Sequence, residues 1–436
     1  MSAKDTRIGS AIAAATCTLL GTTTTAPVVA EEAANWEFDS ALLYYGESDG
    51  RVTDLSASIL ARRDFDDDRF LNLDLAVDTL TGASPSGAIS TGAPQTFTSP
   101  SGDAVYTTAA GEIPFDDTFL DTRFALNVSW SQPFARLYTL TAGLGFSTEY
   151  DYQHMGANFG VTRDFNRRNT TLSAALAYSQ DDIDPVGGAP IGFAQMLDVG
   201  DDSGKGGSES KDVLDLLLGV TQVLGRATVL RVNYSYSDSS GYLTDPYKFL
   251  SVVDPLTGDT LARTPGPGSQ GPTGVYLYEN RPDSRRKQSL FAELKHDFSG
   301  KVLGVSYRFA TDDWSVDSHT LDARFRWPLG QSSYLEPHFR YYMQTAAEFY
   351  RFSLVDGQAL PEFASADPRL ADLDGITFGL KFGHKTASRN EWSARVELYR
   401  QTGSVASDQI IGNQAGRPQF PDLDAVIAQL SYRFKL

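Results

Sequence analysis

Charged side chains recur at every second position inside stretches whose intervening residues are apolar. In the stretch 389–402, for example, Arg395 and Glu397 alternate with Val396 and Leu398. An extended chain places alternate residues on opposite faces, so the charges of one stretch share a face. The candidates for this charged face are Asp74, Asp78, Arg123, Asp164, Asp215, Arg308, Arg324, Arg326, Arg340, Lys381, Arg395, Glu397 and Arg433.

The chemistry expected of these residues is the sorting of solutes. The acids come mostly from the N-terminal half of the chain and the bases mostly from the C-terminal half. If the stretches line a closed channel, an acidic wall facing a basic wall sets a transverse field that selects by size and charge. The alternative is that these groups pair across neighbouring strands and only hydrate and stiffen the wall.

Enzyme signatures are few. The sequence contains no Gly-x-Ser-x-Gly, His-Glu-x-x-His or phosphate-binding glycine-rich loop. Five histidines lie on different stretches, namely His154, His296, His319, His338 and His384. We therefore expect a protein that is not an enzyme. A Ser–His–acid lipase arrangement is the enzymatic alternative that spacing leaves open.

A weak calcium pattern lies in one polar insertion. Asp198, Asp202 and Glu209 occupy positions one, five and twelve of an EF-hand-like count. Gly200 at position three and Ser203 at the turn position both break that pattern. We therefore predict a solvated acidic loop, with no metal and no cofactor.

The spacing of the alternating stretches indicates how these side chains are positioned. About sixteen stretches of roughly ten residues run from Trp36 to Leu436, and the long polar insertions follow odd-numbered ones. The long insertions are 81–119, 181–210, 239–284, 348–371 and 403–423. This parity predicts an all-β fold, a transmembrane antiparallel up-and-down β-barrel of about 16 strands, with 14 to 18 left open. Long loops would be extracellular and short turns periplasmic. A soluble β-sandwich or propeller explains the alternation but not the parity.

The N-terminal segment and the overall composition agree with a location in the bacterial outer membrane. Residues 1–30 read as a secretory signal peptide with cleavage before Glu31, followed by a single barrel domain, 31–436. Cys17, the only cysteine, lies inside that segment. No run of eighteen apolar residues is present, which excludes a helical membrane span. The net charge of −18 excludes nucleic-acid binding through bulk electrostatics.

Several segments of the sequence resemble the bacterial outer-membrane family known as domain of unknown function 3570. They are the segments 44–52, 78–85, 96–98, 116–119, 121–123, 147–152, 163–171 and 184–188. The resemblance covers essentially the whole chain after residue 30 and implies a barrel in the outer membrane. It implies no assigned activity. Genes of such proteins often lie beside flavin-transferase and small lipoprotein genes, which implies a role near a flavin-based redox system.

The sequence thus favours a porin-like channel for small solutes or ions with a mixed-charge lumen, surrounded by outer-membrane lipids. The alternative is a non-conducting barrel scaffold that holds a small lipoprotein or a plug, linked to a flavin-based redox system.

Overall fold

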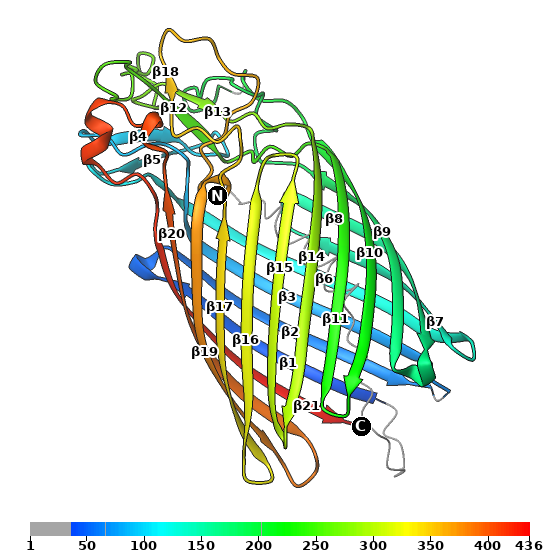
Figure 1. Ribbon diagram of the computed structural model, residues 1–436. Coiled ribbons are helices and arrows are strands. Elements are labelled where there is room, and N and C mark those ends of the chain that lie inside the picture. Colours follow the sequence, from blue (N-terminus) through cyan, green and yellow to red (C-terminus); the bar gives the residue numbers. More distant parts are fainter. Residues whose placement is uncertain (1–35, 66, 202) are drawn as a thin grey trace.

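A closed barrel of sixteen antiparallel strands forms the body of the protein (Figure 1). The computed structural model describes residues 36–65, 67–201 and 203–436, so the predicted signal peptide lies outside the described residues. The barrel strands are β1 (Trp36–Glu47), β2 (Val52–Asp64), β3 (Phe70–Pro85), β6 (Phe115–Ala135), β7 (Tyr138–Thr148), β8 (Tyr152–Phe165), β9 (Thr170–Ile183), β10 (Glu209–Gly225), β11 (Thr228–Gly241), β14 (Ser284–Phe298), β15 (Lys301–Asp312), β16 (Asp317–Leu329), β17 (Ser333–Gln344), β19 (Asp372–Lys385), β20 (Glu391–Ser404) and β21 (Leu423–Lys435). The predicted strand number and up-and-down order are confirmed.

The two ends of the barrel differ in the length of their connections. All five long connections lie at one end of the barrel, here called the long-loop rim. They follow β3, β9, β11, β17 and β20, which are the third, seventh, ninth, thirteenth and fifteenth strands of the barrel, and they comprise residues 86–114, 184–208, 242–283, 345–371 and 405–422. The other end, here the short-turn rim, carries both ends of the barrel domain. There, β1 closes on β21, and Trp36 and Leu436 exchange backbone hydrogen bonds of 3.1 and 2.9 Å. The loop parity expected from the sequence is therefore confirmed.

Alternation of residue types explains why these segments are strands with two unlike faces. In β21, Val426 and Leu430 are 43% and 60% exposed, whereas Ala425, Gln429 and Ser431 lie on the opposite, inner face. Similar exposed apolar rows surround the barrel. An apolar surface of this extent has no protein covering it, so lipid is the solvent that it fits. Among the described residues, no helix is long and apolar enough to cross a membrane.

The insertions contain structure that the sequence did not predict. They hold the short strands β4 (Gln95–Thr98), β5 (Val105–Thr108), β12 (Phe249–Val253), β13 (Tyr276–Tyr278) and β18 (Leu354–Val355). β4 pairs with β5, and β12 lies between β13 and β18. The barrel strands beside the first insertion are also longer than predicted, because β3 and β6 remain paired as far as Pro85 and Phe115. Main-chain hydrogen bonding thus continues into the predicted loop.

Candidate functional site: a charged barrel interior below a folded cap

The predicted charged residues lie on the strand face opposite to the exposed apolar rows. In β20, Val396 and Leu398 are 52% and 59% exposed, and the intervening Arg395 and Glu397 point to the other side of the sheet. The same alternation places the remaining candidates on the inner face. They are Asp74 and Asp78 on β3, Arg123 on β6, Asp164 on β8, Asp215 on β10, Arg308 on β15, Arg324 and Arg326 on β16, Arg340 on β17, Lys381 on β19 and Arg433 on β21.

The densest cluster of these charges spans β16, β17 and β20. Nε2 of His338 lies 2.8 Å from a carboxylate oxygen of Asp322, and Nδ1 lies 2.8 Å from one of Glu397. Arg324 contacts Asp322 at 3.3 Å, and Arg395 contacts Glu397 at 3.5 Å. The imidazole therefore bridges two acids, each of which also faces an arginine.

A glycine makes this bridge possible. β19 lies between β17 and β20, and Gly379 stands in register between His338 and Glu397. A Cβ atom at residue 379 would lie 2.7 Å from Cγ of Glu397, closer than real Cβ atoms approach. The missing side chain leaves the path across β19 open. The pattern of charges alone did not reveal Gly379 as part of the site.

Pairing between neighbouring strands accounts for several other candidates. Arg123 donates a 2.5 Å hydrogen bond to Asp78, and Arg433 donates one of 2.5 Å to Asp39. These contacts match the alternative in which the charges stiffen the wall. Pairing across neighbouring strands is therefore present at these positions of the wall.

The basic side of the interior also carries aromatic rings. The guanidinium of Arg326 lies 3.5 Å from the ring centroid of Tyr334, and the ammonium of Lys381 lies 6.0 Å from the same ring. The guanidinium of Arg308 lies 5.4 Å from the ring centroid of Phe291 on β14. Arg340 pairs in cross-strand register with Asp322 on β16. These bases lie on β15, β16, β17 and β19, next to one another in the closed strand order.

The opposite side of the interior is acidic, with small neutral residues between the acids. Asp74, Asp164 and Asp215 lie on β3, β8 and β10, and β3 is half the closed strand order away from β15. Gly143 and Gly219 occupy the same wall. Cβ atoms there would lie 2.8 Å from Nδ2 of Asn158 and 2.7 Å from Oδ1 of Asn233, so a larger residue at either position requires a neighbouring side chain to shift. Asp74 and Asp164 thus lie across the barrel from Arg308 on β15 and Lys381 on β19, whereas Asp215 on β10 is three strands from β15.

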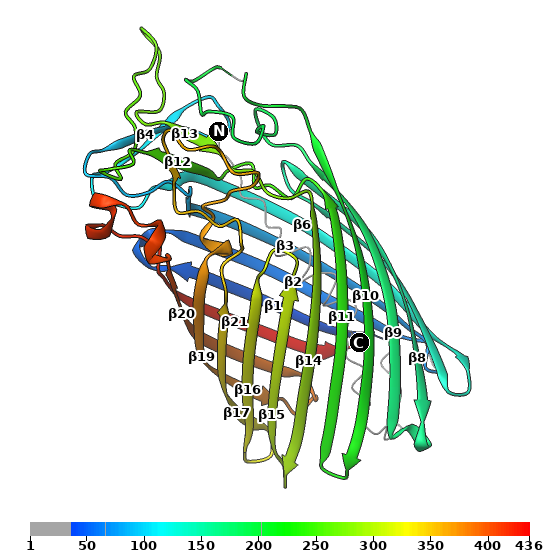
Figure 2. The same ribbon diagram turned by 45° about the horizontal axis from the view of Figure 1, so that its top comes forward.

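The long connections fold together into one cap at the long-loop rim (Figures 1 and 2). Its largest fully buried rings include Phe97, Phe249 and Tyr276, from two connections that are far apart in the sequence. Phe97 packs on Tyr276 with ring centroids 4.7 Å apart, and Tyr106 stacks on Phe97 at 5.0 Å. Stacked and tilted aromatic pairs of this kind give the cap a hydrophobic core of its own.

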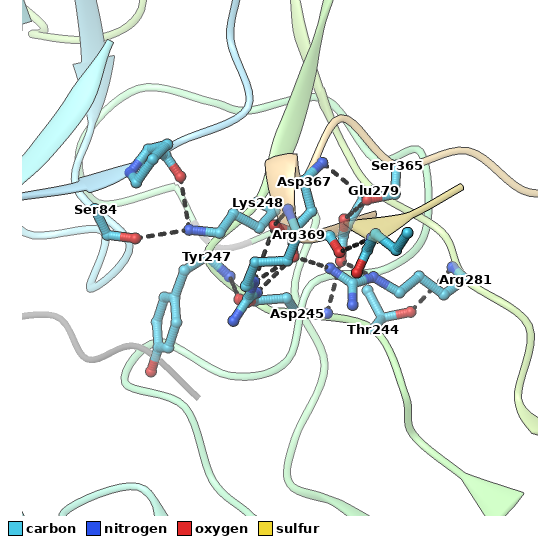
Figure 3. Close-up of polar contacts among 12 residues, drawn as sticks. Ser84, Thr244, Asp245, Tyr247, Lys248, Glu279, Arg281, Ser365, Asp367 and Arg369 are labelled. Atoms are coloured by element: carbon cyan, nitrogen blue, oxygen red, sulfur yellow. Dashed lines mark hydrogen bonds and ion pairs between the residues drawn. The ribbon is translucent and has the colours of Figure 1, made fainter. Parts of the chain in front are cut away.

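A buried ionic cluster lies inside the cap (Figure 3). Arg281 contacts Glu279 at 2.6 Å and donates a 2.7 Å hydrogen bond to Asp367, and Arg369 bridges Asp367 to Asp245. All three acids are at most 1% exposed. Burial raises the pKa of Glu279, whereas Arg369 and Arg281 outweigh burial at Asp367 and hold the pKa of that carboxyl well below its usual range.

One short segment of the cap, 244–248, ties this cluster to the rim. The backbone N–H of Asp245 donates to Glu279 at 2.7 Å, and the ammonium of Lys248 donates to Ser84 and to the carbonyl of Pro85 at the end of β3. The hydroxyl of Tyr247 donates to Asp151 in the turn between β7 and β8. The cap is therefore fastened to the barrel at the end of β3 and at the turn between β7 and β8.

A second group of buried acids lies at the long-loop rim near that turn. Burial, and then the neighbouring carboxylate of Asp121, raise the pKa of Glu149 to about 8. Nearby, the fully buried Asp181 lies 2.6 Å from Nδ1 of His154 and 2.7 Å from the ammonium of Lys211. The rim thus has one acid neutralised by bases and one that holds a proton at neutral pH.

The weak calcium candidates are not brought together. Asp198 accepts hydrogen bonds from Arg263 at 2.5 Å and from the backbone N–H of Gly266 at 2.8 Å. These two contacts, the backbone one first, lower the pKa of Asp198. Glu209 lies at the exposed start of β10, and Asp202 lies outside the described residues. Within the described residues, no group of three acids, histidines or cysteines could hold a metal ion.

The five histidines bond to their neighbours on the wall. Besides His154 and His338, each of the others contacts a hydroxyl, with His296 on Thr228, His319 on Tyr307 and His384 on Ser333. The contact between Ser333 and His384 has a distance of 2.9 Å. No carboxylate in the described part of the chain hydrogen-bonds to His384, so that pair lacks the third member of a hydrolase triad.

A family model with the description "Protein of unknown function (DUF3570)" matches residues 9–434. No curated protein matches the sequence. Solved structures with a similar fold include the CymD monoaromatic hydrocarbon channel, with 8% identity, coverage of 92% of this chain and 88% of that chain, and a TM-score of 0.39. A bacterial polysaccharide outer membrane secretin has 9% identity, coverage of 93% and 100%, and a TM-score of 0.42. The toluene transporter TodX of Pseudomonas putida has 11% identity, coverage of 93% and 90%, and a TM-score of 0.38.

Proposed function

The chain belongs to the DUF3570 family and is a bacterial outer-membrane β-barrel, and from its charged interior we propose that it is a channel for small polar solutes and ions. The observation that carries the proposal is the inner face, where acids of β3 and β8 lie half the closed strand order away from bases of β15 and β19. Charges that face each other across a lumen need water to solvate them, and a barrel of sixteen strands is wide enough for an aqueous channel.

Selectivity in this proposal comes from the transverse field. Arg340 and Lys381 lie on the basic side, and Asp74 and Asp215 lie on the acidic side. A polar solute that aligns its dipole or its charges with this field crosses more easily than an apolar one of equal size. The ionic bridge through His338 then serves to hold the basic wall in a fixed geometry.

The cap controls entry in this proposal. Its aromatic core and buried ionic cluster make it a folded body and not a set of separate loops. Passage then requires either gaps at the edge of the cap or a local opening of it. The long-loop rim is the extracellular one in this orientation, because long loops of such barrels face outward.

The second candidate is a non-conducting scaffold that holds a small lipoprotein or a plug, with a link to a flavin-based redox system. The observation that favours it is the cap, a folded body at the long-loop rim that is held to the end of β3 and to the turn between β7 and β8. The cation–aromatic pairs on the inner wall serve equally well to stiffen a structural barrel.

Single-channel recording in planar bilayers separates the two candidates. We expect stepwise currents from the folded protein, and larger or longer steps from a variant whose cap is weakened, such as Arg281→Met. The absence of current from both the folded native protein and the folded Arg281→Met variant rejects the channel. Silence together with a stoichiometric lipoprotein that copurifies from outer membranes supports the scaffold.

A further inference from the structure

Three basic side chains lie on the lipid-facing side of the barrel at the short-turn rim. Arg63 is the second-last residue of β2, Arg163 lies two residues before the end of β8, and Lys301 is the first residue of β15. Cross-strand register pairs Arg163 with Leu172 and Lys301 with Phe298, which are 43% and 51% exposed. The three bases therefore share the outward face with the apolar rows.

Each base is stacked on an aromatic ring of the same rim. The guanidinium of Arg63 lies 5.5 Å from the ring centroid of Trp36 and 4.5 Å from that of Phe65. Arg163 lies 5.0 and 4.4 Å from the rings of Tyr138 and Phe165, and Lys301 lies 4.5 Å from Trp327. Stacking fixes the position of the charge while the edge of each guanidinium and the end of the ammonium stay available for hydrogen bonds.

No carboxylate of the described chain neutralises these three charges within 4.0 Å. Nε of Arg63 is buried and has no hydrogen-bond partner among the described residues. Bases on the inner face of the same rim are paired with carboxylates: Arg433 contacts Asp39 at 2.5 Å, and Lys435 contacts Glu37 at 3.6 Å. The outward bases thus present an unneutralised charge to the membrane interface.

At the long-loop rim, the lipid-facing aromatic residues contact carboxylates. There, Tyr178 donates a 2.6 Å hydrogen bond to Asp212, and Tyr341 donates one of 2.7 Å to Asp374. The outward bases of the long-loop rim, Arg286 and Arg400, each face a carboxylate, Asp238 at 3.9 Å and Asp424 at 3.8 Å. The two rims therefore differ in that outward bases are paired with carboxylates at the long-loop rim and are stacked on rings without such a partner at the short-turn rim. This difference argues for a ligand specific to one leaflet and against a general attraction to lipid.

We propose that the short-turn rim binds the phosphate headgroups of anionic phospholipids in the periplasmic leaflet, through Arg63, Arg163 and Lys301. A phosphate oxygen accepts charge-assisted hydrogen bonds from a guanidinium or an ammonium, while the acyl chains lie along the apolar rows above. Basic residues at a membrane surface attract anionic lipid in this way. The binding depends on the orientation of the barrel and not on whether its interior conducts.

Native mass spectrometry of the full folded protein tests this assignment. The protein is released from detergent micelles that contain phosphatidylglycerol or phosphatidylcholine with identical acyl chains. We expect preferential retention of phosphatidylglycerol, and a loss of about fivefold in its apparent affinity for each of Arg63→Gln, Arg163→Gln and Lys301→Gln. The variant that combines these three substitutions, here the stacked triple, should lose the preference for phosphatidylglycerol. The matched control replaces Arg167, Arg168 and Arg226 by glutamine, since these are exposed turn residues at the same rim without a stacked ring.

The control triple should keep the preference for phosphatidylglycerol, and Arg63→Lys should restore most of it in the stacked site. Equal retention of the two lipids by the native protein overturns the proposal. Equal losses in both triple variants also overturn it, because bulk charge would then explain the binding. If the stacked triple does not fold, as judged by heat-modifiable mobility in gels, the exposed Arg163→Gln alone decides by the same comparison.

Discussion

Replacing Arg281 by methionine removes the central cation of the cap cluster and keeps a side chain of similar length. In the native protein, Arg281 faces Glu279 at 2.6 Å and Asp367 at 2.7 Å, and all of these groups are buried. Without it, three acids face only two cations, Arg369 and Lys248. Removing one partner of a buried pair costs about 3 to 5 kcal/mol, because it leaves an uncompensated charge in a poorly solvated site.

The cap should therefore open more often while the barrel stays intact. A cost of about 3 kcal/mol corresponds to roughly a 150-fold rise in the open fraction of the cap. Hydrogen-exchange mass spectrometry on the protein in lipid vesicles measures this directly. Peptides from β12 and from 365–371 should exchange faster by that factor, and peptides from β20 should not change.

A surface pair provides the control. Arg286 lies 3.9 Å from Asp238 with its side chain 64% exposed, so Arg286→Met should change cap exchange by less than about tenfold. The reasoning is refuted if Arg281→Met leaves the exchange of β12 unchanged. It is equally refuted if the barrel strands and the cap lose protection together, because the cap would then have no stability of its own.

Three further outcomes are expected. Gly379→Ala should destabilise the barrel by about 1 to 3 kcal/mol in urea unfolding, because the added Cβ would lie 2.7 Å from Cγ of Glu397. The control Gly304→Ala, whose Cβ would have its nearest neighbour at 3.8 Å, should be close to neutral. Equal effects of the two substitutions would contradict the bridge across β19. The folded-state pKa of Glu149 lies near 8, above its ordinary value of 4.5, so its contribution to stability is complete below pH 4.5 and is lost as the pH rises to about 8. Glu149→Gln should therefore melt at a higher temperature than the native protein at pH 8 but not at pH 5, and an equal difference at both values would speak against a buried proton. Arg340→Gln should shift the reversal potential in a salt gradient toward cations, and an unchanged potential would remove Arg340 from the conducting path.

The barrel could be predicted from the sequence because its two periodicities are local. Alternation within each stretch fixes the two faces, as in the closing strand, which follows the predicted insertion 403–423 and lies at Leu423–Lys435. The parity of loop lengths fixes the up-and-down order and the rim at which the chain closes. Both signals follow from the membrane, which demands the same length and the same outward polarity of every strand.

The cap could not be predicted in the same way, because its contacts join connections that are far apart in sequence. Arg281 and Asp367 are 86 residues apart. Neither has a local pattern that sets it apart from other loop charges. One signal was present, since Phe249–Val253 and Tyr276–Tyr278 are apolar or aromatic runs inside polar insertions. Such runs indicate burial, and an expectation of folded loops could have been drawn from them.

The interior site was predictable as a set of charges but not as a network. The bridging role of His338 depends on Gly379, which sequence alternation treats only as a small residue between polar ones. The calcium pattern shows the converse case. Asp198 fits a ligand position by spacing, yet its oxygens face Arg263, which comes from a different connection. Local spacing cannot reveal a partner supplied by another loop.

A channel requires that one face of each barrel strand meets water and that the other meets lipid. The predicted mature chain has no cysteine, so single cysteines can be placed at two adjacent residues of β21, Ser431 and Leu430. The folded variants in lipid vesicles are then treated with a charged thiol reagent that does not enter lipid. We predict rapid labelling of Ser431→Cys, which faces the interior, and protection of Leu430→Cys, which is 60% exposed toward lipid. Protection of Ser431→Cys, or rapid labelling of Leu430→Cys, would contradict a water-filled lumen inside a lipid-embedded barrel.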